Sequence, residues 1–312
     1  MKIIKDNRGY ATGIIMLILL IPILLLLVIT IEEYEHDVNS TVESLESNKI
    51  KTSTENFEEE LILLTKQSLH EVSLDVIGSG RALTNSRKEL KEVLQSKVDN
   101  ATTRFLENNI IISCHIDGID SSDNPFDIEV HYSLEATLNS SKSKISKKEC
   151  RLVEITDADY PVYDPLPTLK TGAVFDDDRV YYLNRLSGYI TLDAGEAYSN
   201  AVQPVTVRQC PYNTYPEHGN HNNTMLNCIK NHYYHNSHDG LCLLCRLENR
   251  TSCKDYGFET FIIPTVVMEQ APASIDHVLL NDKNAQYNGN NIRLDNNTII
   301  YLDNGHKVKY GL

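Results

Sequence analysis

The sequence predicts an α+β protein in which a single N-terminal transmembrane helix and a helical hairpin stalk precede an antiparallel β-sheet outer domain. Three observations predict this order. An apolar run without charge covers Gly9–Ile31. Apolar residues then recur at helical spacing as far as Phe105, and from Ile110 they alternate with polar residues as in a half-buried strand. The chain of 312 residues leaves room for one large or two small domains beyond the first helix.

The apolar run is long enough to cross a bilayer core, which needs roughly 20 apolar residues. We therefore expect a transmembrane helix over residues 10–31, with residues 1–9 as a cytoplasmic leader or N-terminus. The basic residues before the run are Lys2, Lys5 and Arg8, and the acidic residues after it are Glu32, Glu33, Glu35 and Asp37. Because basic flanks stay in the cytoplasm, we expect a single-pass protein of the cell membrane with its bulk outside the cell. No small-residue cleavage site follows the run, which favours a retained anchor.

The N-terminal stretch also resembles a known family. Arg8-Gly9, Ala11, the apolar run with Pro22 and Leu24–Leu27, and Glu32-Glu33 are similar to the N-terminus of type IV pilin-like proteins, especially tight-adherence pseudopilins and archaeal pilin-like surface proteins. The resemblance implies that a peptidase cuts after Gly9, that the mature chain begins at Tyr10, and that the helix mediates assembly with pilin-like partners. Many members carry a glutamate five residues into the mature helix, where this chain has Ile14. A plain single-pass anchor is the alternative.

Residues 32–108 are expected to form the helical stalk. One apolar stripe consists of Phe57, Leu61, Leu64, Leu69, Val72 and Val76, and a second of Leu90, Val93, Leu94, Val98, Ala101 and Phe105. Gly78-Ser79-Gly80 separates the stripes, and Ser86 with Glu89 predicts a capping box at the start of the second helix. Two stripes of this kind predict a helical hairpin.

Residues 109–158 are expected to form the antiparallel β region. The inner face of its first strand would carry Ile110, Ile112, Cys114 and Ile116, and that of its second Phe126, Ile128, Val130, Tyr132, Leu134, Ala136 and Leu138. Asp120–Pro125 predicts the turn between these strands, and a further strand is expected at Cys150–Ile155. The order of a membrane helix, helices and an antiparallel sheet resembles the plan of pilin-like subunits.

A proline-rich segment follows the predicted sheet. Tyr160–Lys170 contains three prolines, which we expect to exclude regular structure there. Residues 159–170 are therefore interpreted as a linker, followed over residues 171–312 by a C-terminal β-rich domain with a part rich in cysteine and in loops.

Two further signals lie in that C-terminal domain. Asp176–Asp178 is interpreted as a solvated turn, with a set of calcium ligands as the alternative. Turn signals at Asn288-Gly289 and Asp303–Gly305 predict a β meander, in which Ile299–Leu302 pairs with Lys307–Tyr310 as a terminal hairpin.

Residues 210–253 hold five of the seven cysteines. Cysteines outside the cytoplasm usually oxidise, so we favour disulfides, with a Cys114–Cys150 bridge, two bridges within residues 210–253 and one thiol left over. The candidates are Cys114, Cys150, Cys210, Cys228, Cys242, Cys245 and Cys253. One alternative is a structural zinc site at Cys210, Cys228, Cys242 and Cys245, with His232, His235 and His238 as further possible ligands. Another is a redox pair at Cys242 and Cys245. No other cofactor is expected.

Surface features agree with a location outside the cell. The net charge of −14 argues against a nucleic-acid partner, because such a partner requires a basic surface. Six sequons follow the apolar run and predict glycosylation at Asn39, Asn100, Asn139, Asn222, Asn249 and Asn296.

No GxSxG or HExxH motif occurs, so we do not expect an enzyme. We expect a pilin-like structural or adhesion component of the cell surface. The alternatives are a surface protein that binds a ligand or glycan without a filament role, and an extracytoplasmic zinc-dependent enzyme using residues 210–253. The stretches Asp239–Cys253, Lys254–Pro264 and Lys307–Leu312 also resemble the C-terminal part of uncharacterised surface proteins of methanogenic archaea. This second resemblance implies the same surface class and no known activity.

Overall fold

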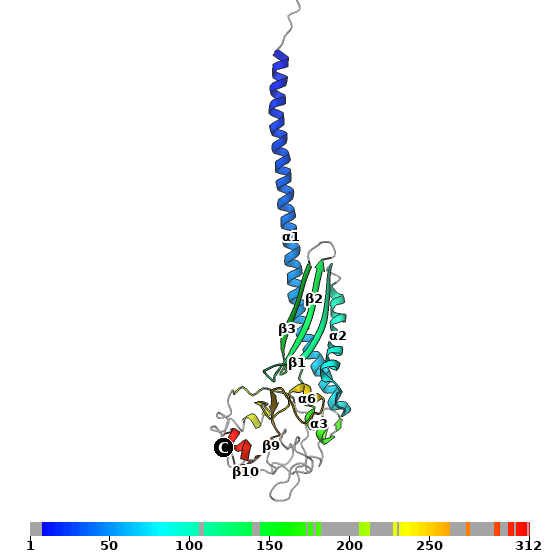
Figure 1. Cartoon of the computed structure of the whole chain (residues 1–312), viewed down its shortest axis with the longest axis vertical. Coiled ribbons are helices and arrows are strands. Elements are labelled where there is room, and N and C mark those ends of the chain that lie inside the picture. The colour runs from blue at the N-terminus through cyan, green and yellow to red at the C-terminus, as the bar shows by residue number, and fades with distance from the viewer. Residues whose placement is uncertain are drawn as a thin grey trace, which may run out of the picture.

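A long helix and a body built around its C-terminal half make up the fold (Figure 1). The computed structural model describes residues 8–105, 109–138, 144–172, 174–176, 179–181, 206–212, 227–229, 231–262, 273–274, 290–293, 299–302, 304–310 and 312. Within these ranges the sheets are mostly antiparallel, and the predicted α+β class with a long apolar N-terminal helix is confirmed.

Helix α1 (Arg8–Ser79) is continuous over 72 residues and includes Pro22. Its described side chains are exposed or half-exposed before Ile50, whereas one face is buried from Ile50 onward. That buried face contains the whole predicted stripe from Phe57 to Val76. The helix ends as predicted at the glycines: Gly80 has a left-handed φ of 62°, and its N–H donates to the carbonyl of Val76 at 2.9 Å.

Helix α2 (Ser86–Phe105) contacts α1, as the two stripes predicted. The predicted capping box is wrong by one residue. The side-chain oxygen of Asn85 accepts the N–H of Lys88 at 3.0 Å, and a carboxylate oxygen of Glu89 accepts the N–H of Asn85 at 3.0 Å. Asn85 therefore caps the helix, since asparagine serves this role as well as serine does. The hydroxyl of Ser86 is instead used in a contact described below.

Strands β1 (Ile110–Ser121), β2 (Asp127–Leu138) and β3 (Lys144–Glu154) form an antiparallel sheet in that order. Residue Ile110 pairs with Leu138 at one end of the first ladder, and Asp127 pairs with Glu154 at one end of the second. Alternate residues of β1 and β2 are buried, as predicted, in one hydrophobic core with the stripes of α1 and α2. The predicted third strand is real but begins six residues earlier than expected, at Lys144 instead of Cys150.

A charged cluster around Glu58 explains why the sequence pattern missed the start of β3. The buried carboxylate of Glu58 in α1 accepts hydrogen bonds from Tyr132 at 2.5 Å and from Arg151 at 3.1 Å, and it also pairs with Lys147. Burial alone would raise the pKa of Glu58, but these three partners outweigh it and the pKa lies below its usual value. Polar side chains therefore occupy the inner face of this strand, where the sequence pattern would require apolar ones.

The proline-rich segment packs on the body instead of lying outside it. Val162 and Leu166 are buried in the same core as the sheet. The expectation that Tyr160–Lys170 lacks regular structure is wrong at its end, because α3 (Leu166–Thr171) is a short helix there. Pro165 is its N-cap residue and Pro167 lies in its first turn, where a missing N–H removes no helical hydrogen bond.

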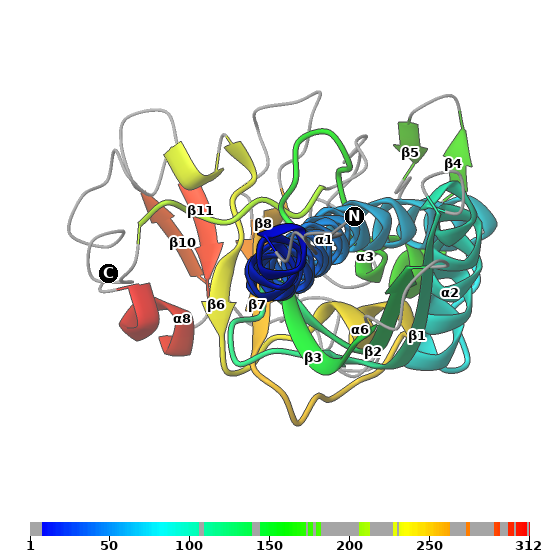
Figure 2. The same cartoon turned by 90° about the horizontal axis from the view of Figure 1, so that it is seen from above.

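The described part of the C-terminal region consists of short elements. They are β4 (Val174–Asp176) with β5 (Arg179–Tyr181), β6 (His235–Ser237) with β7 (Gly257–Glu259), helix α6 (Leu243–Leu247), and a sheet of β10 (Asn290–Arg293), β11 (Ile299–Leu302), β9 (Ala273–Ser274) and β8 (Phe261–Ile262). Helix α8 (Asn304–Tyr310) follows β11. Figure 2 shows β10, β11 and α8 on the side of α1 away from α2.

The predicted terminal hairpin is wrong. Strand β11 pairs with β10, which precedes it, and Lys307–Tyr310 belongs to helix α8. Asn304, at the start of α8, is compatible with a turn and with a helix, because residues that favour turns also favour the first positions of helices. Asp176 lies in β4, whereas Asp177 and Asp178 fall outside the described residues.

Candidate functional site: the anchor helix and two thiol clusters

The apolar start of α1 is a candidate membrane span. Among the described residues, one helix is long and apolar enough to cross a membrane, and none of its apolar window is buried against the body. Every large apolar side chain from Ile15 to Ile29 is at least half exposed, and Ile31 is 49 % exposed. Gly9 and Tyr10 lie in the first turn of the same helix, and the side chain of Tyr10 falls outside the described set.

A narrow apolar stripe continues beyond this span. Tyr34, Val38, Val42 and Leu45 are all exposed. Because successive residues of an α-helix are rotated by about 100°, these four side chains fall within an arc of about 80°. The other residues between Tyr34 and Leu45 are mostly acidic or carry a hydroxyl group. An exposed apolar stripe on an otherwise polar helix is typical of a surface that packs against another helix.

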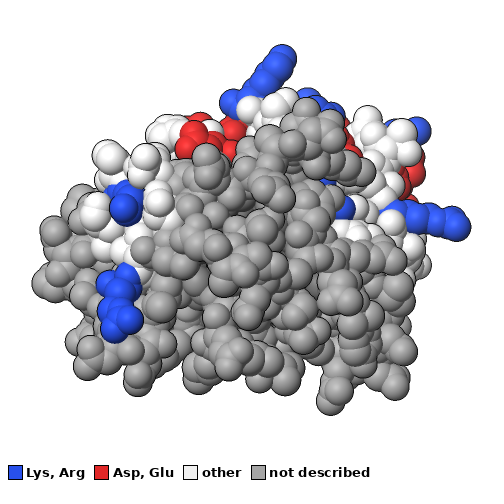
Figure 3. All heavy atoms as spheres, turned by 90° about the horizontal axis from the view of Figure 1, so that it is seen from below, with Lys and Arg blue, Asp and Glu red and all other residues white. Residues whose placement is uncertain are grey.

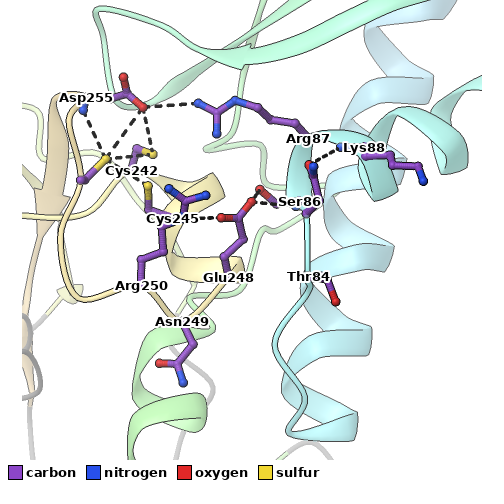
Figure 4. A network of polar contacts seen from close by, with 12 residues as sticks. Thr84, Ser86, Arg87, Lys88, Cys242, Cys245, Glu248, Asn249, Arg250 and Asp255 are labelled. Carbon is purple, nitrogen blue, oxygen red and sulfur yellow. Dashed lines mark hydrogen bonds and ion pairs between the residues drawn. The ribbon is translucent and has the colours of Figure 1, made fainter.

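The first thiol cluster consists of Cys242, Cys245, Cys253 and Asp255, and we call it the Cys3Asp cluster (Figure 4). Cys242 is the N-cap residue of α6, Cys245 lies inside that helix, and the other two lie on the segment that leads to β7. One ligand atom from each of the four residues lies within 4.8 Å of the others. The Sγ atoms of Cys245 and Cys253 are 3.1 Å apart, and those of Cys253 and Cys242 are 3.4 Å apart.

Close packing of Gly257 helps to hold this cluster together. A Cβ atom at Gly257 would lie 2.3 Å from the carbonyl oxygen of Gly240, so a side chain there would push apart β7 and the residues just before Cys242. Only glycine permits this approach. The backbone N–H of Asp255 also donates to the sulfur of Cys253 at 3.4 Å, which orients that thiol.

The electrostatics of the cluster favour a negative charge on sulfur. A hydrogen bond from the Cys245 thiol, opposed by burial but aided by the Cys245 backbone N–H, lowers the pKa of the Cys242 thiol to about 6. The same hydrogen bond and burial raise the pKa of Cys245, and burial raises that of Cys253. Two arginines lie nearby: despite burial, the hydrogen bond to Asp120 raises the pKa of Arg87, and the hydrogen bond to Glu248 raises that of Arg250.

Contacts beside the cluster join it to the helical hairpin (Figure 4). The carboxylate of Glu248 accepts the N–H and the hydroxyl of Ser86 at 2.8 and 2.7 Å. The guanidinium of Arg87 donates to Asp255 at 3.4 Å and to Asp120 at 2.7 Å. The start of α2, the end of β1 and the Cys3Asp cluster therefore meet at one point.

The second thiol cluster consists of Cys210, Cys228 and His235. The two sulfurs are 3.3 Å apart, and all three residues are buried. The N–H of Cys210 donates to the carbonyl of Tyr234 at 2.8 Å, which places Cys210 beside the strand that carries His235. Within the described part of the chain, this cluster brings together three ligand atoms, one fewer than the Cys3Asp cluster.

The structure thus places the four cysteines of the predicted zinc site in two separate clusters. Cys210 and Cys228 fall in one cluster, and Cys242 and Cys245 in the other. Sequence reasoning included Cys253 only as a disulfide candidate and missed Asp255, Arg87 and Arg250. The pattern Cys-x-Asp shortly after Cys-x-x-Cys could have indicated Asp255, whereas Arg87 is distant in the sequence and gave no signal.

The expected Cys114–Cys150 bridge does not fit the sheet. Cys114 pairs with Leu134 on the inner face, and Cys150 pairs with His131 on the outer face, with β2 between their strands. Burial raises the pKa of Cys114 to about 12, so its thiol stays protonated in the core. Cys150 instead lies 4.0 Å from a ring nitrogen of His131, which also contacts Glu129.

The predicted glycosylation sites are distributed unevenly over the structure. Asn39 and Asn100 are exposed on α1 and α2, respectively. Asn249 is half-buried, has a left-handed φ of 53° and follows the cluster helix α6. Asn139, Asn222 and Asn296 lie outside the described residues, as do several other segments of the C-terminal region.

Charge on the described surface is mixed. Basic and acidic side chains both occur on the described part of the face farthest from the start of α1 (Figure 3). A scan against protein-family models and searches of curated proteins and of solved structures found no match to the chain. The site must therefore be interpreted from its own geometry.

Proposed function

We propose that the protein is a pilin-like surface subunit, anchored in the cell membrane by residues 10–31 with its N-terminus in the cytoplasm and its body outside. The orientation follows from the basic residues before the span and the acidic residues after it. The observation that carries the proposal is the continuity of α1. One helix has an exposed apolar start and a second half that packs on an antiparallel sheet.

The stripe Tyr34–Leu45 supports an assembly role for this helix. In the proposed orientation it lies just outside the bilayer, where lipid cannot cover it. An apolar side chain that leaves water contributes about 25 cal/mol for each Å² buried, so four such side chains favour packing against a neighbouring helix. We therefore assign the stripe to contacts between copies of α1 or with other pilin-like subunits.

The mature N-terminus tests the processing step of the proposal. Chain purified from its native membrane should give an N-terminal peptide that begins at Tyr10, because the peptidase of the family cuts after the residue equivalent to Gly9. Replacing Gly9 with Leu should leave the leader attached. Mass spectrometry that finds only chains starting at Met1 would instead favour a lone single-pass surface protein, the alternative without a filament role.

A matched pair of double variants tests the assembly face. Val38→Asp with Leu45→Asp places two charges on the stripe, whereas Ser40→Asp with Ser47→Asp places two charges on the opposite side of the same helix turns. We expect the first variant to reduce cross-linked oligomers in native membranes by at least about tenfold, because buried unpaired carboxylates are strongly unfavourable. The second should assemble as the parent does. Equal cross-linking in both variants would refute a role for the stripe.

A further inference from the structure

We propose that the Cys3Asp cluster, formed by Cys242, Cys245, Cys253 and Asp255, binds one Zn²⁺ ion as a structural site. The inference does not depend on the proposed surface role, because it rests on the donor set and its surroundings alone. It assigns the site to a different group of residues from that predicted from the sequence.

The donor number and spacing fit a closed tetrahedral site. Structural zinc takes four protein ligands, and this cluster supplies three sulfurs and one carboxylate. With a Zn–S bond of 2.3 Å, two sulfurs of a tetrahedron lie about 3.8 Å apart. The observed separations of 3.1 and 3.4 Å are nearer to that value than to the roughly 2.05 Å of a disulfide bond. Three thiolates also select a soft cation over magnesium or calcium.

A positive charge and a backbone N–H lie beside the negative ligands of the cluster. Three thiolates and one carboxylate around Zn²⁺ leave two excess negative charges. Arg87, which also pairs with Asp120, donates to Asp255 and places a positive charge beside these ligands, while Arg250 pairs with Glu248. The N–H of Asp255 donates to the Cys253 sulfur at 3.4 Å. Such outer contacts orient metal ligands and tune their affinity.

A disulfide accounts for this arrangement less well. The three sulfurs lie close to one another, so a bond between any two would leave the third thiol without a disulfide partner beside it. A metal ion uses all three thiols, and each thiol loses its proton on binding. Among the described residues, the second thiol cluster brings together three donors, against four in the Cys3Asp cluster.

The position of the site indicates its structural role. The ligands come from the N-terminus of α6 and from the segment before β7, and Arg87 links them to the start of α2. The ion would hold residues 242–255 as a closed loop against the end of the helical hairpin. With four protein ligands it has no open position for a substrate, which distinguishes it from a catalytic zinc site.

Metal content of the full-length protein in detergent provides the test. After purification under reducing conditions without chelator and incubation with ZnCl₂, elemental analysis should find one tightly bound zinc per chain. Cys253→Ser should lose it, while Cys150→Ser and Cys210→Ser should retain it. Replacement by Co²⁺ should give the thiolate charge-transfer band of a tetrahedral site. Parent protein without zinc or this band, or Cys253→Ser with full zinc content, would overturn the proposal.

A second pair of variants covers the case in which Cys253→Ser fails to fold. Arg87→Gln removes a charge that contacts the cluster, and Lys88→Gln removes the charge of the next residue, which is exposed and pairs with Glu92. Competition with a chromogenic chelator should show zinc binding weakened about 10- to 100-fold by Arg87→Gln and unchanged by Lys88→Gln. Equal affinities in the two variants would contradict the assigned site.

Discussion

Two parts of the body are stabilised in different ways. The helix–sheet body, comprising residues 50–105 of the hairpin and the sheet β1–β3, is held by a continuous apolar core. The cysteine-rich segment, residues 206–212 and 231–262, adds Leu243, Leu244, Phe258 and other residues to the same core, but it also depends on buried polar and thiol contacts. The first part distributes its stability over many similar side chains. The second part also depends on a few buried polar residues, and the loss of one of them leaves its partner buried without a charge or hydrogen bond.

The buried pair Arg246–Asp164 shows this dependence most clearly. Both side chains have no exposure, and a guanidinium nitrogen of Arg246 lies 2.7 Å from Asp164. Arg246 also donates to the carbonyls of Leu241 and Phe258, and the hydroxyl of Tyr234 donates to Asp164 at 2.8 Å. One arginine thus links the proline-rich segment to both sides of the cysteine-rich segment.

The largest effect is therefore expected from Arg246→Met. The variant leaves the Asp164 carboxylate buried without its cation, which costs about 3–5 kcal/mol. We expect hydrogen exchange to lose protection over residues 234–260 while residues 57–76 of α1 and β2 stay protected. Lys88→Met, which removes an exposed charge, should change stability by less than about 1 kcal/mol. Equal loss of protection in both parts would mean that they unfold as one unit.

A core truncation should affect the other part. Leu94 in α2 is fully buried between the helix and the sheet, so Leu94→Ala should lower the free energy of unfolding by about 3 kcal/mol. Leu152→Ala on the outer face is the matched control, because Leu152 is 58 % exposed. Its cost should stay below about 1 kcal/mol. Urea denaturation followed by circular dichroism measures both, and similar midpoints would argue against this packing.

The smallest of the three effects concerns Glu58, a buried carboxylate in the helix–sheet body. Glu58→Gln should cost about 2 kcal/mol at neutral pH, because it weakens hydrogen bonds between charged partners. The pKa of Glu58 is lowered by folding, so this contribution is present above the usual carboxyl pKa and is lost as the pH falls below it. The stability difference between parent and variant should therefore shrink from pH 6 to pH 3. A constant difference would exclude the assigned charge state.

The difference between apolar and polar packing also explains which elements could be predicted from the sequence. Periodicity identified both helices and the first two strands, because apolar core positions repeat at 3.6 or 2 residues. It missed the first half of β3, where Lys147 faces Glu58 from a position that usually holds an apolar residue. It also missed α8, since Lys307–Tyr310 is too short for either period to decide.

Only part of the candidate metal site could be predicted from the sequence. The spacing of Cys242 and Cys245 is local, and it indicated a pair of thiols that could act together. The remaining parts come together only through folding. Arg87 lies more than 150 residues before the cluster in the sequence and reaches it because Ser86 and Leu83 bind the end of α6. Long-range contacts of this kind leave no periodic signal.

The continuity of α1 has a mechanical consequence. A helix rises 1.5 Å per residue, so about 28 Å separate Ile31 from Ile50, where the body begins. No break interrupts this stretch in the described structure, so α1 would act as a lever between membrane and body. In the proposed anchor, a change of about 10° in helix tilt would move the start of the body sideways by about 5 Å. Lateral force on the body would in turn be transmitted as torque to the lipid-embedded segment.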